Sequence, residues 1–96
     1  MLFMVTEKFL DTAAIRKRFL EKVRMMPHDV RFVESFIALD GATCYQLMTA
    51  PDEKALQPWI AKWSDLMEFE ITAVLPSAEF WQKFEKIDAN SRTIQI

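Results

Sequence analysis

The feature that most constrains the fold is a hairpin signal at the centre of the chain. Asp40-Gly41 contains the only glycine of the sequence and separates two strand-like runs, residues 30–39 and 42–49. Asp-Gly between apolar runs is typical of a two-residue primed turn, which requires positive φ at both central positions. We therefore expect a β-hairpin with a two-residue turn at its tip.

A two-residue turn also fixes which residues lie opposite each other. The pairs expected on one face are Ile37/Cys44, Ser35/Gln46 and Val33/Met48, and those on the other are Phe36/Tyr45, Glu34/Leu47 and Phe32/Thr49. Both faces are largely apolar, whereas a sheet with one solvated face is polar on that side.

Helical and strand patterns flank the hairpin symmetrically. Residues 2–9 and 68–75 have strand character, and helices are expected over residues 13–26 and from about residue 53. The order is strand–helix–strand–strand–helix–strand, which predicts an α+β, ferredoxin-like βαββαβ fold. The antiparallel sheet is expected in the order 4-1-3-2, with both helices on one face.

Details of the two helices refine this expectation. Asp11-Thr12 is a candidate N-cap of the first helix, whose apolar stripe includes Phe19, whereas Arg24 is expected to face solvent, and Pro27 to end the helix. In the second helix, Pro58 indicates either a late start or a kink.

The length predicts a single domain, residues 1–96, with a core over 1–87 and a tail over 88–96. A short helix is expected over residues 78–87, and residues 93–96 regain strand alternation, so we expect them to be frayed or swapped onto a partner. Because the helices can cover only one apolar sheet face, we also predict a homodimer, with Phe36 and Tyr45 near its interface.

Charge and cysteine content exclude several classes of protein. Twelve basic against fourteen acidic residues give a net charge of −2, so no general attraction for nucleic acid is expected, although residues 16–31 carry six basic side chains. No apolar run approaches the roughly 20 residues of a membrane helix, and the five apolar residues at the start are too few for a signal peptide. With Cys44 as its only cysteine, the chain is expected in the reducing cytoplasm.

Several stretches together resemble a known family. They are the opening residues 1–5, the hairpin with residues 44–52, the Trp59-Ile60 and Trp63 region, residues 65–70, and residues 77–81. In this order and spacing the chain resembles the bacterial family called domain of unknown function 3303, over about residues 1–81. Phe36, where tryptophan is expected, and Pro58 depart from the family pattern.

The resemblance implies the dimeric α+β barrel superfamily, in which two ferredoxin-like subunits pack sheet against sheet. Superfamily relatives include cofactor-independent monooxygenases, haem-degrading enzymes, lactone isomerases and small-ligand sensors. The family itself implies no catalytic residue.

Single reactive side chains give little evidence of catalysis. His28 is the only histidine, which excludes a multi-histidine metal site, and we favour a role in capping the preceding helix over general base or haem ligand. Cys44 has no base beside it in the expected register, so a small buried side chain is favoured over a nucleophile. No catalytic residue, metal or cofactor is predicted.

Ser35 and Gln46 are the strongest candidates for a binding site. If their face lies under the helices, either they hydrogen-bond to each other inside a plain core, which we favour, or they line a pocket with Cys44 and Trp63. Such a pocket is expected between the sheet and the second helix, at the open end of the hairpin, and would take a small apolar or aromatic ligand.

Other polar and aromatic side chains have ordinary interpretations. Glu34 lies diagonal to Tyr45 on the opposite face. We expect its carboxylate either to reach the rim of the sheet or to meet an arginine, and a role as an acid of raised pKa is the less favoured interpretation. Trp59, Trp63 and Trp81 are interpreted as core residues.

Two functions follow from these patterns. We expect a small-ligand-binding or scaffolding module. The alternative is a cofactor-independent monooxygenase-like or isomerase-like enzyme, which rests on fold analogy.

Overall fold

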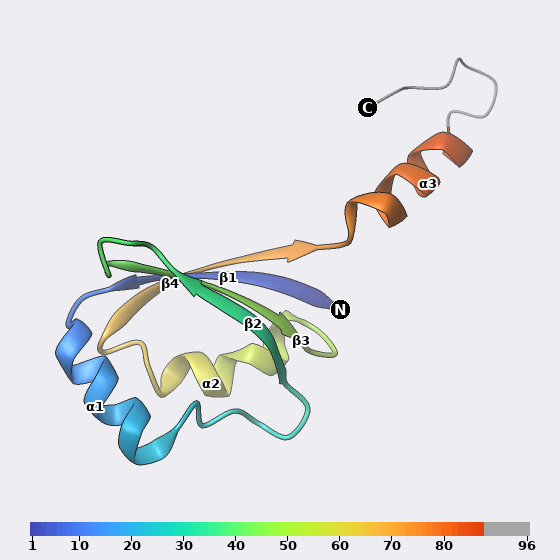
Figure 1. Cartoon of the computed structure of the whole chain (residues 1–96). Coiled ribbons are helices and arrows are strands. Elements are labelled where there is room, and N and C mark those ends of the chain that lie inside the picture. The colour runs from blue at the N-terminus through green and yellow to red at the C-terminus, as the bar shows by residue number, and fades with distance from the viewer. Residues whose placement is uncertain (88–96) are drawn as a thin grey trace.

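The computed structural model describes residues 1–87, which form a four-stranded antiparallel sheet with helical segments on one face (Figure 1). The strand order is β2-β3-β1-β4, which is the predicted 4-1-3-2 read from the other edge. The elements are β1 (Leu2–Phe9), α1 (Thr12–Lys22), β2 (Arg31–Ile37), β3 (Thr43–Thr49), the 3-10 helix η1 (Glu53–Leu56), α2 (Gln57–Ala61), β4 (Met67–Val74) and α3 (Ser77–Ile87).

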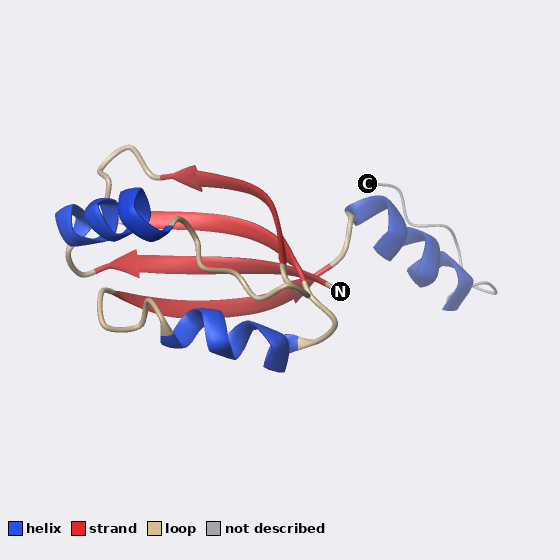
Figure 2. Cartoon of the chain, turned by 90° about the horizontal axis from the view of Figure 1, so that it is seen from below, coloured by secondary structure: helices blue, strands red, loops and turns tan. Residues whose placement is uncertain are grey.

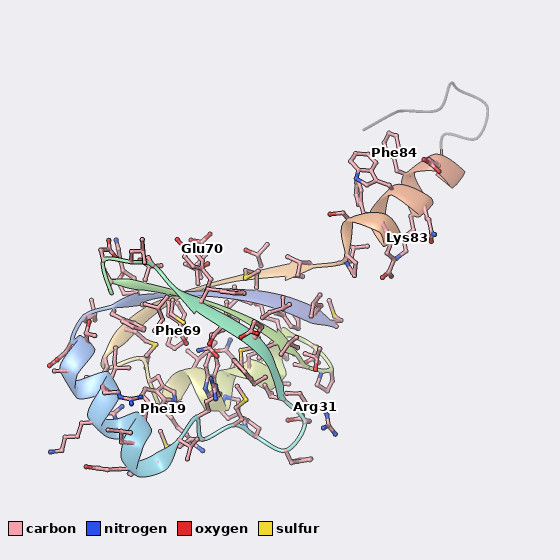
Figure 3. All side chains as sticks on the ribbon, in the orientation of Figure 1. Phe19, Arg31, Phe69, Glu70, Lys83 and Phe84 are labelled. Carbon is pink, nitrogen blue, oxygen red and sulfur yellow. The ribbon has the colours of Figure 1, made fainter. Side chains whose placement is uncertain are left out.

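The hydrophobic core lies between the sheet and the helical layer formed by α1 and η1–α2. Alternation along the strands points Phe3 and Val5 of β1 and Met48 of β3 to this inner face, where all three are buried. Leu56 and Trp59 fill the core from the helical side. Figure 3 shows this alternation on β4, where the neighbours Phe69 and Glu70 point to opposite sides of the sheet.

The tip of the hairpin differs from the predicted turn. Only Gly41 has positive φ, at 73°, and the Gly41 N–H donates to the Ala38 carbonyl. The Asp40 carboxylate accepts from the Ala42 N–H at 2.9 Å, and the next pair joins the Ala38 N–H to the Thr43 carbonyl. A four-residue loop therefore replaces the two-residue primed turn, because Asp40 satisfies the loop backbone without adopting positive φ.

The predicted register survives near the loop and fails further along. The predicted two-residue turn and the observed four-residue loop are both centred between Asp40 and Gly41, so Ser35 lies opposite Gln46 as expected. A bulge at Val33 then shifts the pairing. Beyond it the partners are Phe32/Met48 and Arg31/Thr49, in place of the predicted Val33/Met48 and Phe32/Thr49.

Helix α1 ends four residues before its predicted end. Asp11 caps its start as expected, with the carboxylate accepting from the Ala14 N–H at 3.0 Å. At Val23 the backbone turns to φ 58° and ψ −146°, and Met25 also has φ 58°. This turn, and not Pro27, stops the helix, so Arg24 lies on a loop whose backbone points it away from the expected solvent face.

The second helical segment begins late. One 3-10 turn, η1, precedes α2, and Pro58 lies in the first turn of α2, where a missing N–H removes no hydrogen bond. The sequence predicted either a late start of this helix or a kink at Pro58, and the structure shows the late start.

Helix α3 projects beyond β4 and lies apart from α1 and α2 (Figures 1 and 2). Its aromatic residues Phe80, Trp81 and Phe84 pack on one another, with ring centroids 4.9–6.3 Å apart. The interpretation of Trp81 as a core residue is therefore wrong for this chain, whereas Trp59 and Trp63 are buried. The predicted strand at residues 93–96 falls outside the described residues. Among residues 1–87, no helix is long and apolar enough to cross a membrane.

The positive φ at Val23 gives a testable stability prediction. A β-branched residue in this nearly glycine-only conformation stores roughly 1–3 kcal/mol of strain, and the Val23 side chain is exposed. Val23→Gly should therefore raise the free energy of urea unfolding by about 1 kcal/mol. Leu20→Gly, at an exposed position inside α1, is the control and should lower it by about 1 kcal/mol. A loss of stability in both variants would show that Val23 is unstrained.

Candidate functional site

A carboxylate and an amide lie side by side on the inner face of the sheet. Glu7 of β1 and Gln46 of β3 are only 2% and 8% exposed. Gln46 Nε2 donates to Glu7 Oε2 at 2.8 Å. Strand alternation explains the burial of Glu7, which shares its face with Phe3 and Val5. An acidic side chain with the parity of core residues was the signal that sequence reasoning missed.

This pairing corrects the expected role of Ser35. Ser35 and Gln46 are cross-strand partners, as predicted. The Gln46 side chain, however, hydrogen-bonds to Glu7 on β1, which is the neighbour of β3 on its other side. In the described part of the chain, the buried Gln46 Oε1 has no hydrogen-bond donor and the indole N–H of Trp59 has no acceptor. Unpaired buried groups are uncommon in native proteins and call for a specific explanation.

Burial controls the ionisation of this pair and of its neighbour Cys44. Loss of hydration raises the pKa of the Glu7 carboxyl, while hydrogen bonds from Gln46 and Cys44 and the charge of Arg24 oppose the rise. Burial, together with the charge of Glu7, raises the pKa of the Cys44 thiol to about 12. Cys44 therefore stays a protonated, buried thiol at neutral pH, and thiolate nucleophilicity is excluded.

The inner cavity, as we call it, opens beside Glu7 and Gln46 and has a volume of about 240 Å³. Its walls come from β1, α1 and the loop after it, β2, β3, the α2 region and the start of β4. The lining residues are Glu7, Phe9, Thr12, Ile15, Arg16, Phe19, Arg24, Ser35, Ile37, Cys44, Gln46, Trp59, Trp63 and Met67. The structure thus brings all four predicted site residues, Ser35, Cys44, Gln46 and Trp63, to one cavity.

The cavity lies at the loop end of the hairpin and under α1, not at the predicted open end under the second helix alone. Ile37 and Cys44, next to the hairpin loop, line it, and Thr12 Oγ1 donates to the Gly41 carbonyl nearby. Among the lining residues, Arg16 of α1 and Ile37 of β2 are exposed to solvent, whereas Glu7 is buried. The mouth of the cavity therefore lies between α1 and β2. Figure 3 shows Phe19 of α1 on the side facing the sheet.

Arg24 is the second site residue that the sequence did not reveal. It is half-buried, lines the cavity, and its Cζ lies 3.7 Å from the centre of the Phe32 ring and 5.3 Å from that of Phe19. Its carbonyl accepts from the indole N–H of Trp63 at 3.0 Å. The periodic pattern placed Arg24 on a helix, whereas the positive-φ residues on both sides of it reverse the backbone and direct it inward.

The remaining candidates lie away from this site. Glu34 is exposed on the outer face, and its carboxylate accepts from the Ser35 N–H, which fits the rim interpretation and leaves no desolvated acid there. His28 is exposed and follows the end of α1 by six residues, so the predicted capping role is wrong. Over residues 1–87, no three metal-ligating side chains are grouped.

Comparison with known proteins places the chain in a family without assigning an activity. The family model described as "Domain of unknown function (DUF3303)" matches residues 1–88, slightly more than the predicted resemblance covered. No curated protein and no solved structure matches the chain.

The buried carboxyl makes a signed prediction about pH. Because the pKa of Glu7 is raised in the folded state, folding is penalised as pH rises above its ordinary value of 4.5, and the penalty disappears below it. Glu7→Gln removes this charge and can also donate to Gln46 Oε1. We expect the variant to be more stable than the wild type at pH 8, by about 1 kcal/mol, and similar to it at pH 4.

Thermal unfolding at the two pH values measures this difference. Glu21→Gln, at an exposed position on α1, is the matched control and should change stability equally little at both. A Glu7→Gln variant that loses stability at pH 8 would contradict the assignment of Glu7 as a desolvated carboxyl.

Proposed function

The chain belongs to the DUF3303 family, and we propose that this member binds a small, largely aromatic ligand in the inner cavity. The observation that carries the proposal is the hydrogen-bonded Glu7–Gln46 pair, buried at the floor of a cavity that is otherwise mostly apolar. Ser35 and Cys44 add polar contacts, and Trp63 forms an apolar wall.

A plain core gives no reason for this arrangement. A buried carboxyl is costly unless it is paired, and an apolar side chain at position 7 would fill the space without that cost. Ligand sites combine apolar walls with a few convergent polar groups, and perturbed pKa values are common in them. The unpaired Gln46 Oε1 supports the proposal further, because a ligand donor would satisfy it.

An isomerase-like enzyme is the second candidate function, and the raised pKa of Glu7 is the observation that favours it. A carboxyl whose pKa is raised above its ordinary value is a stronger base when ionised, which suits it to take a proton from one carbon of a ligand and return it to another. Exchange of the α-hydrogens of 2-tetralone in D2O, catalysed by the wild type and lost in Glu7→Gln, would favour this candidate over binding alone.

The proposal includes a homodimer formed through the outer face of the sheet, which α1 and α2 leave uncovered. On this face the exposed Phe36 and Tyr45 lie opposite each other, and the half-buried Leu47 and Met4 continue the apolar surface across β3 and β1. The aromatic cluster of the projecting α3 offers a second surface for the partner. A reducing compartment such as the cytoplasm suits the free thiol of Cys44.

Gln46→Leu tests the ligand site. The change strands the Glu7 carboxyl, so stability should fall by about 1–3 kcal/mol. It should also abolish the rise in Tm that 2-naphthol, as a probe, gives with the wild type. Gln82→Leu, at an exposed position on α3, is the matched control and should keep the full rise. An unchanged 2-naphthol response in Gln46→Leu would sink the proposed site.

Phe36→Asp tests the dimer. Phe36 is 67% exposed in the single chain, so a charge is tolerated in the monomer but is desolvated at the proposed interface. We expect a dimer for the wild type and a folded monomer, or loss of folding, for the variant, in light scattering at micromolar concentration. Leu39→Asp, at the exposed hairpin tip, should remain dimeric. A monodisperse wild-type monomer would refute the dimer.

A further inference from the structure

The charged groups of the inner cavity are separated by depth. Glu7 lies at the buried floor, Arg24 is half-buried, and Arg16 is exposed at the mouth. Two guanidinium groups therefore stand between solvent and the floor, and the only carboxyl in the lining is the one whose burial disfavours its charge.

Within residues 1–87, neither of these guanidinium groups donates a hydrogen bond. In the described part of the chain, neither Arg16 nor Arg24 forms an ion pair, whereas Arg18 on the same helix as Arg16 makes a bidentate bond to Asp65 with both distances at 2.8 Å. An arginine left without a carboxylate at a cavity mouth is suited to bind a carboxylate through two parallel hydrogen bonds.

Arg24 is also held in place before any ligand arrives. Its guanidinium lies over the Phe32 ring, its carbonyl accepts from the Trp63 indole, and the positive φ values of Val23 and Met25 turn it toward the cavity. A fixed side chain loses little conformational entropy on binding, which favours affinity.

The floor offers the opposite chemistry. Gln46 Oε1 is a buried acceptor that no donor among residues 1–87 reaches, and Glu7 beside it is a second acceptor when ionised. Between floor and mouth the walls are aromatic, from Phe9, Phe19, Trp59 and Trp63. A complementary ligand carries a hydroxyl at one end, a flat apolar body and an anionic group at the other end.

We infer that the inner cavity binds a hydroxylated aromatic carboxylic acid, with the carboxylate at Arg16 and Arg24 and the hydroxyl donating to Gln46. This inference rests on the proposed ligand-binding function and names its ligand class. A volume of about 240 Å³ lies below the usual 300–1,000 Å³ of ligand pockets, which limits the ligand to one or two rings.

Calorimetric titration of the full chain with three matched probes tests the inference. The probes are 6-hydroxy-2-naphthoate, its neutral amide 6-hydroxy-2-naphthamide, and 2-naphthoate, which lacks the hydroxyl. We expect 6-hydroxy-2-naphthoate to bind about tenfold more tightly than either of the others, since each lacks one end of the complementary pair.

Variants assign each preference to its residue. Arg24→Gln should reduce the preference for acid over amide to about twofold or less, and Arg16→Gln should reduce it in part. Arg24→Lys keeps the charge but cannot form two parallel hydrogen bonds, so it should retain only part of the preference, more than Arg24→Gln and less than the wild type. Lys17→Gln, on α1 outside the lining, is the charge-matched control and should change nothing.

The outcomes separate the two levels of the proposal. If the acid and the amide bind equally and Gln46→Leu weakens both, the cavity is a ligand site but the inferred anionic class is wrong. A preference for the acid that survives Arg24→Gln and Arg16→Gln together would also overturn the inference. If none of the three probes binds at millimolar concentration, both the ligand class and the proposed function fail.

Discussion

The candidate site is built around one buried polar interaction, the hydrogen bond from Gln46 to Glu7 on the inner face of the sheet. It lies where β1 and β3, the two central strands, pair with each other. On the inner face, the nearest side chains of the same strand are core residues, such as Val5 beside Glu7 and Met48 beside Gln46. A carboxyl held there reduces the stability of the folded chain at neutral pH, a cost that is common at binding and catalytic sites. The cavity beside it, the aromatic walls and the inward-facing arginine all make sense as the surroundings of that group.

The cavity exists because α1 covers the sheet without closing onto it. No residue of α1 is fully buried, and the helix ends early at a strained turn, so space remains above β2 and β3. The η1–α2 segment packs tightly instead, with Leu56 and Trp59 almost completely buried. One helical element therefore builds the core, and the other forms the roof of the cavity.

The sequence predicted the fold well because its strongest signals are local. Asp40-Gly41 located the hairpin and its register near the loop, and the strand order follows from that layout. Periodicity does not encode backbone conformation or packing between distant segments. For this reason it did not predict the bulge at Val33, the early end of α1 or the projection of α3. Part of the cavity lining was predictable: Ser35, Cys44 and Gln46 followed from the hairpin register, and Trp63 from the apolar stripe of the second helix. Glu7 was overlooked on a strand, and Arg24 was assigned to a helix face although the helix ends before it.

The central claim is that Glu7 is a desolvated carboxyl inside an accessible cavity, and its own titration tests this most directly. Carbon-13 NMR of the side-chain carboxyl carbon follows Glu7 as pH is varied. We predict a midpoint for Glu7 above the ordinary glutamate value of 4.5, because burial outweighs the hydrogen bonds and the charge of Arg24. A Glu7 midpoint at or below 4.5 would contradict this claim.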